Sequence, residues 1–325
     1  MRVLITGATG FVGGWTADAI ARRGHQIRFL VRNPDKLARA AAFFGFDADD
    51  AVVGDITDEA GVARALQGCD AVVHAAAEVA LHGTDADGER ALVQRNLAGA
   101  RNVIGGAVRA GIDPVVHVSS IAALWTPTTA VMHGDLPVTG GAGAYGQAKT
   151  AVEVYVRSLQ DEGAPVAIVY PTGVAGPSAA GHRGEAGDGV RTLAGVGVLG
   201  RTAGLTLVDV RDLADLHVRL LEPGHGPRRI LAGGHRIIGA DLARALRHAS
   251  GRHTRYVPIP NRALLGIGRL ADRFRSLVPA GVDQLSESAA QYLLYPPIPD
   301  NSAAASLGAT FRPATETIDA VFDDD

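Results

Sequence analysis

Short apolar runs recur along the first half of the chain and alternate with stretches of helical spacing. The runs lie at residues 3–5, 27–31, 51–53, 71–73, 115–118 and 166–169. Between them, apolar residues recur every three or four positions, as in Val12, Trp15 and Ala19 before Gly24. This alternation predicts βαβ units. Because the strands are apolar throughout, we expect helices to cover both faces of a parallel sheet.

The pattern therefore predicts an α/β fold, with a doubly wound Rossmann sheet and a smaller C-terminal α/β region. The predicted Rossmann domain covers residues 1–172, with a returning strand and helix near 205–221, and residues 173–325 form the smaller region. Ten glycines lie from Gly173 to Gly204, so we expect long loops there with one short helix around residues 190–194. A strand at 229–231 and a helix at 240–249 follow.

Composition and charge narrow the class of protein. The 325 residues are 47% hydrophobic and 20% charged, with a net charge of -3, which excludes a disordered chain and disfavours nucleic acid as a partner. No apolar run approaches the roughly 18 residues that cross a membrane, and the first strand starts too early to leave room for a signal peptide. Cys69 is the single cysteine, so we expect no disulfide and a cytoplasmic location.

A glycine-rich turn joins the first strand to the first helix. It reads Thr6-Gly7-Ala8-Thr9-Gly10-Phe11-Val12-Gly13, which has G-x-x-G-x-x-G spacing and not the general G-x-G-x-x-G. Glycines allow a tight turn and let backbone N–H groups and the positive helix end approach a pyrophosphate. The turn therefore predicts a dinucleotide site that includes Gly7, Thr9, Gly10, Phe11, Val12 and Gly13.

The end of the second strand bears on which dinucleotide binds. An acidic residue there would accept a hydrogen bond from the ribose 2′-OH of NAD, but this chain has Arg32, with Lys36 nearby. A guanidinium can hold the 2′-phosphate of NADP through two hydrogen bonds. NADP is the preferred cofactor, and NAD stays open because Arg32 is also readable as a solvated surface arginine. Asp55, after the third strand, is placed to reach the adenine amino group.

Tyr145 and Lys149 are four residues apart at the start of a predicted helix, so both side chains should emerge on one face. A phenol is a poor acid or base at neutral pH, and an adjacent cation is expected to lower its pKa into the working range. Lysine is otherwise almost absent, since Lys36 and Lys149 are the only two. We therefore predict that Tyr145 is a catalytic acid/base assisted by Lys149.

The strand at residues 115–118 delivers Ser119 and Ser120 to its C-terminal end, where ligands bind in open α/β sheets. A hydroxyl there can polarise a substrate carbonyl while the tyrosine supplies a proton. Serines also form ordinary turns, so this pair gains its meaning from the tyrosine and lysine that follow.

Together these residues resemble the extended short-chain dehydrogenases/reductases, which include sugar-nucleotide epimerases, dihydroflavonol reductases and 3-beta-hydroxysteroid dehydrogenases. Further motifs carry the resemblance: Gly54-Asp55-Ile56, His74-Ala75-Ala76-Ala77, Asn96, Tyr170-Pro171 through Gly176-Pro177, and Val210-Arg211-Asp212. The resemblance implies that Ser120, Tyr145 and Lys149 are catalytic, that Tyr145 and Lys149 also contact the cofactor, and that Asn96 is structural. It also implies cofactor contacts by Ile56, Ala75, Ala76, Ala77, Pro171 and Val174, and a region 173–325 that mainly binds substrate.

Departures from the family pattern favour its reductase and hydroxysteroid branches. Ser120 is followed by Ile121-Ala122-Ala123 where nucleotide-sugar dehydratases carry an Asp-Glu pair. Residues 169–174 read Val-Tyr-Pro-Thr-Gly-Val where epimerases usually show an Arg-Tyr-Phe-Asn type segment. Ala148 stands where many members have serine, which leaves the acid/base pair intact.

The sequence thus predicts an NAD(P)-dependent oxidoreductase that transfers a hydride between nicotinamide C4 and an apolar carbonyl or alcohol substrate. Glu78, His82 and Trp125 are candidate substrate residues, and a homodimer is expected from the family alone. No metal site is predicted, because the histidines lack ligand spacing. Two alternatives stay open: a sugar or nucleotide-sugar epimerase that uses bound NAD, and a non-catalytic NADP-binding regulatory protein.

Overall fold

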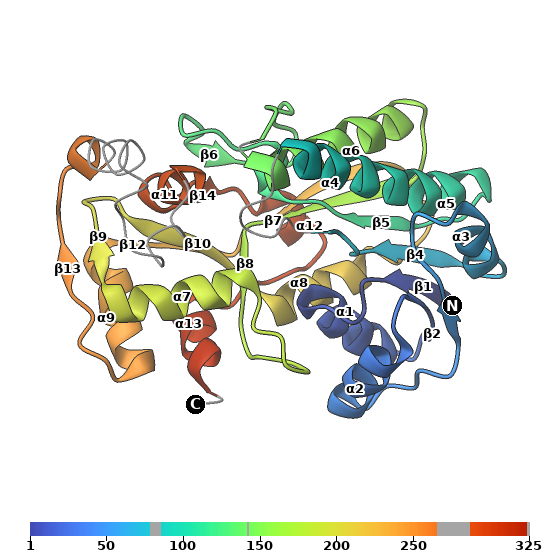
Figure 1. Ribbon diagram of the computed structural model, residues 1–325, viewed down its shortest axis with the longest axis horizontal. Coiled ribbons are helices and arrows are strands. Elements are labelled where there is room, and N and C mark those ends of the chain that lie inside the picture. Colours follow the sequence, from blue (N-terminus) through green and yellow to red (C-terminus); the bar gives the residue numbers. More distant parts are fainter. Residues whose placement is uncertain (79–85, 142, 265–286, 324–325) are drawn as a thin grey trace.

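The computed structural model describes residues 1–78, 86–141, 143–264 and 287–323. Two layers of helices enclose a large sheet, and a smaller region extends from its carboxyl edge (Figure 1). Within the described residues, no helix is long and apolar enough to cross a membrane.

The large sheet has seven parallel strands in the order β11-β7-β5-β4-β1-β2-β3. The strands are β1 (Arg2–Thr6), β2 (Gln26–Val31), β3 (Ala51–Val53), β4 (Ala71–His74), β5 (Val115–Val118), β7 (Val166–Pro171) and β11 (Arg228–Ala232). The strand order reverses between β1 and β4, which is the arrangement of a doubly wound fold. The predicted Rossmann sheet is confirmed.

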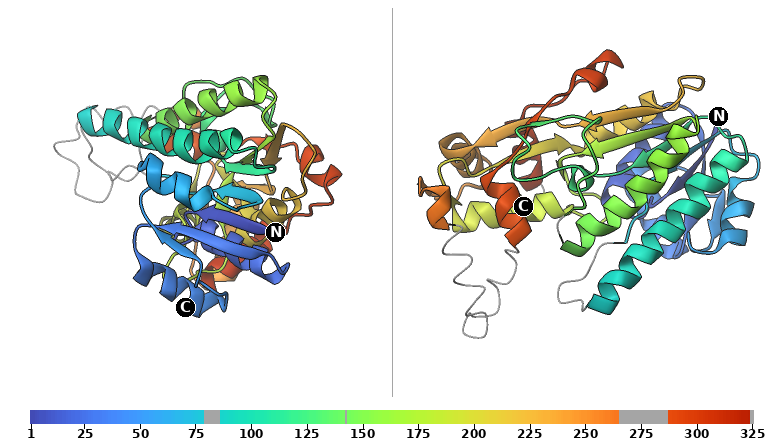
Figure 2. Two further views of the ribbon diagram at one scale, coloured as in Figure 1. Left: turned by 90° about the vertical axis from the view of Figure 1, so that its right-hand side faces the viewer. Right: turned by 90° about the horizontal axis from the view of Figure 1, so that it is seen from above.

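Helices cover both faces of this sheet, as the apolar strands predicted. On one face lie α3 (Glu59–Leu66), α4 (Ala86–Ala100), a π-helical turn (Arg101–Gly105), α5 (Gly106–Arg109) and α6 (Gly143–Asp161). On the other face lie α1 (Phe11–Arg22), α2 (Pro34–Phe44) and α8 (Val210–Arg219). Figure 2 shows the two layers edge-on, with α4 and α6 on one side and α1 and α2 on the other.

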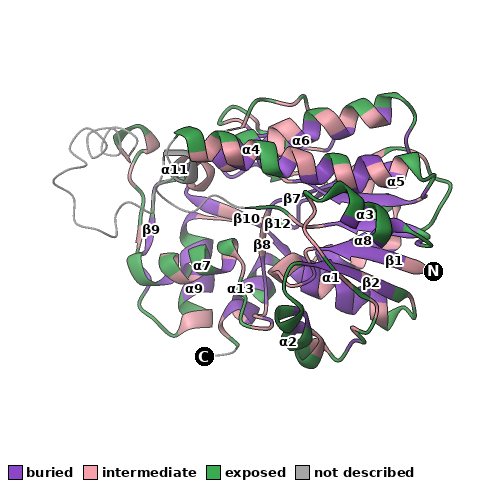
Figure 3. Cartoon of the chain, turned by 45° about the vertical axis from the view of Figure 1, so that its right-hand side comes forward, coloured by how far each residue is buried: buried purple, intermediate pink, exposed green. Residues whose placement is uncertain are grey.

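Successive strand residues contribute to two separate cores. Val3 and Ile5 pack with α1, α2 and α8, whereas Leu4 packs with the helices of the opposite face. Most strand residues are consequently buried, except in the edge strand β3, where Ala51 and Val53 are exposed, and the outer helix surfaces are exposed (Figure 3). Because the sheet offers no free face, only its edges and strand ends can carry chemistry.

Residues after Gly173 build a second, smaller core. Its helices are α7 (Glu185–Val196), α9 (Gly239–Ser250), α11 (Glu287–Leu294) and α13 (Ala314–Phe322), whereas α12 (Ser302–Ser306) packs in the first core beside β11. A three-stranded sheet joins β12 (His235–Ile238), β10 (Gly204–Asp209) and β8 (Gly173–Ala175), and short pairs join β13 (Tyr256–Val257) to β9 (Val198–Leu199) and β14 (Ile298–Pro299) to β6 (Val131–Met132).

Two sequence expectations for this part change. The returning helix, α8, packs on α1 in the Rossmann domain. The strand near residue 205, however, is β10 of the small sheet, and β11 forms the edge of the large sheet beside β7. The helix expected at 190–194 spans twelve residues. Its glycines lower helix propensity, yet Val190 and Ala194 are buried in the second core, and tertiary packing outweighs propensity.

We predict that Gly189→Ala stabilises the protein. Gly189 is inside α7, and a Cβ there would meet nothing within 4 Å, so alanine should raise the free energy of unfolding by about 0.5–1 kcal/mol. Urea denaturation measures this. Gly184→Ala is the matched control: its φ is +72° and the added carbon would lie 2.6 Å from the Phe11 ring, so it should destabilise. Stabilisation by both substitutions, or by neither, would contradict the helical conformation of Gly189 and the left-handed conformation of Gly184.

Candidate active site

The carboxyl ends of the parallel strands bring the predicted site residues to one edge of the large sheet. Gly7 follows β1, Arg32 follows β2, Asp55 lies just after β3, Ala75 follows β4 and Ser119 follows β5. α6, which carries Tyr145 and Lys149, lies beside the ends of β4 and β5. The fold therefore brings site residues that are spread between positions 7 and 149 of the sequence to the same edge of the sheet.

The glycine turn requires glycine for two separate reasons. Gly7 has φ of +85°, and a Cβ there would lie 2.7 Å from the backbone nitrogen of Ala76. A Cβ on Gly13 would lie 2.0 Å from the carbonyl oxygen of Gly7. Gly10 caps α1 in an extended conformation, and no acidic side chain occupies the first turn of that helix. The turn thus presents bare backbone and a positive helix end at the sheet edge, with Thr9, Phe11 and Val12 partly exposed beside it.

The charged residues after β2 and β3 lie beside each other. The Arg32 guanidinium is 77% exposed and lies 3.8 Å from the Asp55 carboxylate. Hydrogen bonds from Thr57 hold the pKa of Asp55 below its ordinary value, and Arg32 adds to this. Lys36 is exposed in the first turn of α2, where its backbone N–H donates to Asn33. Ile56 lies against Gly99 of α4. Arg32 and Lys36 are thus accessible to an anion at this edge.

The segment after β4 is held by hydrogen bonds to its backbone. Ala75 N–H donates to the Thr6 carbonyl at 3.2 Å. The Asn96 side chain accepts from Glu78 N–H at 2.9 Å and donates to the Glu78 carbonyl at 3.1 Å, which is a structural role. Two guanidinium nitrogens of Arg95 donate to the Glu78 carboxylate, at 2.6 and 3.0 Å. This predicted substrate residue is therefore already paired with an arginine.

Tyr145 and Lys149 lie on successive turns of α6, as their spacing predicted. The Lys149 ammonium donates to the Val118 carbonyl at 3.3 Å, which anchors it at the end of β5. Ser120 has an extended backbone and its hydroxyl accepts from Ala122 N–H at 3.1 Å. The Ser120 side chain also lies near the Tyr145 phenol and favours its ionised form. The structure therefore brings Ser120, Tyr145 and Lys149 together, although their cofactor contacts stay predictions.

The expectation that Lys149 lowers the pKa of Tyr145 into the working range is wrong. Burial raises the pKa of Tyr145 to about 12; the neighbouring Ser120 side chain opposes this shift, and the Glu185 carboxylate adds to it. The Lys149 nitrogen lies 5.8 Å from the centroid of the phenol ring, so the ammonium faces the ring. The loss of hydration on burial is the largest influence on the pKa of the phenol. Burial also lowers the pKa of Lys149 to about 8, against Glu153 and Glu185, which raise it.

Two histidines border a small recess beside Lys149. It has a volume of about 10 Å³ and is lined by His74, His117, Tyr145 and Lys149 among others. The two imidazole rings stack with centroids 5.8 Å apart, and His74 hydrogen-bonds Thr6 at 2.8 Å. Burial lowers the pKa of His74 to about 3 and that of His117 well below its ordinary value. Both rings are therefore neutral when the site works near neutral pH.

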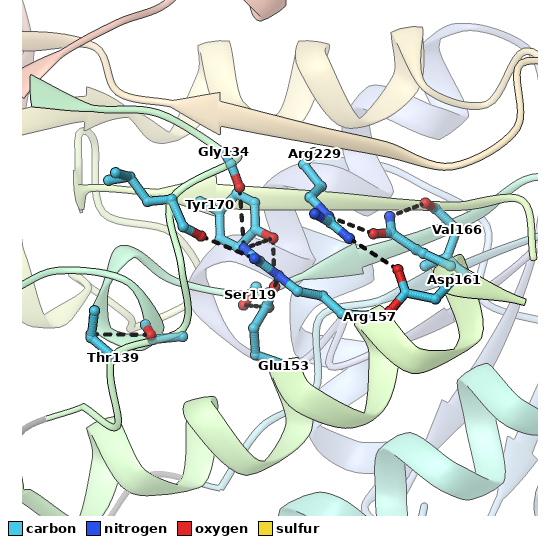
Figure 4. Close-up of polar contacts among 12 residues, drawn as sticks. Ser119, Gly134, Thr139, Glu153, Arg157, Asp161, Val166, Tyr170 and Arg229 are labelled. Atoms are coloured by element: carbon cyan, nitrogen blue, oxygen red, sulfur yellow. Dashed lines mark hydrogen bonds and ion pairs between the residues drawn. The ribbon is translucent and has the colours of Figure 1, made fainter.

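A buried carboxylate lies one turn beyond Lys149. Glu153 has no exposed surface and accepts hydrogen bonds from Ser119 at 2.7 Å, from Arg157 at 2.7 Å and from the Tyr170 hydroxyl (Figure 4). Arg157 also donates to the carbonyls of Leu136 and Gly134. Such satisfaction is what a buried charge requires. The network ties α6 to the ends of β5 and β7.

Aromatic residues from the C-terminal part complete the surroundings of Tyr145. Trp125 is buried and stacks on Tyr292 of α11, with ring centroids 3.9 Å apart. Tyr145 raises the pKa of Tyr292, which places the two phenols near each other. Pro171 is buried at the end of β7 and Val174 lies in β8; their predicted cofactor contacts stay predictions. The candidate substrate residue His82 lies outside the described residues.

Sequence reasoning missed Tyr292 and Glu185. Because only six tyrosines occur in the chain, the close spacing of Tyr292 and Tyr295 was a usable signal for aromatic side chains near the site. Glu185 begins α7 and faces Tyr145 and Lys149 from the smaller region. Its contact with the site depends on the packing of distant segments, which no local pattern encodes.

Comparison with known proteins agrees with this geometry. The model of the NAD-dependent epimerase/dehydratase family matches residues 3–239. The chain belongs to this family. A Synechocystis protein provisionally named dihydroflavonol 4-reductase is 32% identical over 72% of the chain and 66% of its own length. Cinnamoyl-CoA reductase 1 of rice is 29% identical over 77% of the chain and 76% of its own length.

A solved structure shows the same fold at lower identity. UDP-glucose 4-epimerase from Bifidobacterium longum, in complex with NAD+ and UDP, superposes with a TM-score of 0.72 at 18% identity, over 99% of this chain and 97% of that one. The sequence-based prediction of the family is confirmed, and the reductase names of the sequence relatives support an oxidoreductase enzyme within it.

We predict that Lys149 titrates near pH 8, because burial disfavours its charged form. With only two lysines in the chain, isotopic labelling of lysine side chains yields two NMR signals, and Lys36→Arg assigns them. Lys149 should be charged below pH 8 and lose its charge above it. A titration midpoint for Lys149 above 10 would contradict the burial that the structure gives it.

Proposed function

We propose that this protein is an NADP-dependent reductase, which transfers a hydride between nicotinamide C4 and the carbonyl carbon of an apolar small molecule. The observation that carries the proposal is the position of Tyr145 in the first turn of α6, beside Ser120 and one helical turn from Lys149, whose ammonium lies 5.8 Å from the phenol ring. A proton donor and a second hydroxyl are thereby presented at the carboxyl edge of the sheet, next to the glycine turn. The family and the reductase relatives support this reading.

The residues at the sheet edge fit a dinucleotide. A Cβ at Gly7 or Gly13 would fill the turn with backbone contacts under 3 Å, so the chain keeps its backbone bare where a pyrophosphate would need to approach. Arg32 and Lys36 are exposed where an adenosine 2′-phosphate would lie, which favours NADP over NAD. Ala75, Ala76 and Ala77 line the same edge with small side chains.

The bound nicotinamide would supply or accept the hydride. Ser120 would hold the substrate oxygen by a hydrogen bond, which strengthens as that oxygen gains charge. Tyr145 would give its phenol proton to the oxygen, so that the carbonyl becomes an alcohol. Lys149 would hold the cofactor ribose, as the family resemblance implies, and place positive charge beside the phenol. Each group contributes position or a proton, which are the terms a protein supplies.

The ionisation of the site supports the reductive direction. A phenol whose pKa is about 12 is protonated at neutral pH and is ready to donate. Oxidation of an alcohol would need the phenolate, which this burial disfavours. The stacked rings of Trp125 and Tyr292 beside Tyr145 favour an apolar or aromatic substrate.

We predict that Tyr145→Phe lowers kcat about 100-fold or more while the dissociation constant for NADPH stays within about twofold, because the variant removes the hydroxyl that carries the transferred proton and keeps the ring. Substrate-dependent NADPH oxidation and fluorescence titration measure the two quantities. Tyr155→Phe, on the same helix, is the matched control and should leave kcat unchanged. Full kcat in Tyr145→Phe would exclude the mechanism, whereas NADPH binding by the wild type without turnover of any substrate would support the regulatory alternative.

We predict that Arg32→Ala raises KM for NADPH about tenfold and leaves KM for NADH nearly unchanged, because a charge-assisted hydrogen bond to the 2′-phosphate is lost. Arg39→Ala, an exposed arginine of α2, is the control and should change neither constant. An equal effect of Arg32→Ala on both cofactors would contradict the preference for NADP.

The epimerase alternative differs in how the cofactor behaves. A reductase consumes NADPH in proportion to product, whereas an epimerase retains NAD and shows no net turnover. A panel of apolar ketones, aldehydes and nucleotide sugars, assayed for both NADPH consumption and product, separates the two. Interconversion of nucleotide sugars without cofactor consumption would replace the proposal.

A further inference from the structure

The inner face of α6 carries four polar residues at four-residue intervals: Tyr145, Lys149, Glu153 and Arg157. Residues at this spacing lie on one face, one turn apart. The first two belong to the candidate active site. The last two are directed between the helix and the sheet, where hydrophobic residues are normally found, so their burial requires an explanation.

We propose that Glu153 is a positioning residue for the proposed reaction, which fixes Ser120 against Tyr145 through Ser119 and maintains the charge of Lys149. The inference rests on the proposed function, because it concerns how those three residues act. Glu153 itself contacts neither substrate nor cofactor in this account.

The first part of the argument is geometric. Ser119 is buried, its N–H donates to the Val169 carbonyl at 2.9 Å, and its hydroxyl donates to Glu153 at 2.7 Å. Adjacent side chains on an extended backbone point in opposite directions, and Ser120 is extended, with φ of -164° and ψ of 152°. Fixing the Ser119 side chain therefore also fixes the direction of the Ser120 hydroxyl, which meets Tyr145.

The carboxylate is held independently of Ser119. Arg157 and the Tyr170 hydroxyl both donate to the other oxygen of Glu153, and Arg157 is itself bound to two carbonyls of the segment before α6 (Figure 4). The strand ends of β5 and β7 and the helix α6 thus share one anion. A rotation of the helix would therefore strain several of these hydrogen bonds together.

The second part of the argument is electrostatic. Among the described residues, the charged and titratable groups around Lys149 are Tyr145 and Glu153 of α6, Glu185 of α7, His74 of β4 and His117 of β5. Glu78 lines the same recess and is paired with Arg95. The two histidines are neutral, burial opposes the ammonium, and Glu153 is the first of the two carboxylates that raise the pKa of Lys149. Glu185 is exposed and hence screened by water, whereas Glu153 is fully buried.

The test combines three variants with two readouts. Ser119→Ala cuts the link to the strand end and leaves the charge in place, so kcat should fall about tenfold while the NMR midpoint of Lys149 stays unchanged. Glu153→Gln should lower kcat and also move the Lys149 midpoint about one pH unit down. Ser158→Ala, which removes a hydroxyl from the exposed face of the same helix, is the matched control and should change neither readout.

The NMR readout keeps the test separate from the proposed function. It uses the whole 325-residue chain and needs no substrate. An absence of wild-type turnover would therefore count against the proposed reaction and leave the electrostatic part of the inference testable. Because Glu153→Gln leaves Arg157 without its anion, the double variant Glu153→Gln/Arg157→Met is included to preserve folding. An unmoved Lys149 midpoint in both, with wild-type kcat in Ser119→Ala, would reduce Glu153 to a folding role and overturn the inference.

Discussion

Burial of both faces of the large sheet is the constraint on which the rest of the structure depends. Helices on both sides leave the strand interiors without water, so the strands are apolar and their polar groups pair within the sheet. Chemistry is then confined to the strand ends. Parallel strands place all those ends at one edge, and the glycine turn, Arg32, Ala75 and Ser120 meet there although they are far apart in the sequence.

Burial also acts directly on the ionisable groups of α6. It raises the pKa of Tyr145 and lowers that of Lys149, because leaving water disfavours the charged form of either group. The phenol is thereby kept as an acid, and the ammonium depends on nearby carboxylates for its charge. A polar stripe on the inner face of a helix is expensive, and here each member of it has a partner that offsets the loss of hydration.

Local patterns in the sequence were sufficient for the sheet, the glycine turn and the helix that presents Tyr145 and Lys149. These features follow from periodicity and from spacing within a few residues. Three others could not be obtained that way. The position of β11 at the sheet edge depends on how the chain returns from the smaller region. The approach of Glu185 and Tyr292 to Tyr145 depends on the same long-range packing. The direction of the Tyr145 pKa depends on burial, which spacing alone does not reveal.

The stacked pair of His74 and His117 has a consequence for how the site responds to acid. Histidine is the side chain whose charge ordinarily changes between pH 5 and 8, but burial lowers the pKa of His74 to about 3 and that of His117 well below its ordinary value. Neither ring takes up a proton when the surroundings drift from neutral to mildly acidic. The charge of the groups around Lys149 therefore stays the same in mildly acidic surroundings, even though two of these groups are histidines.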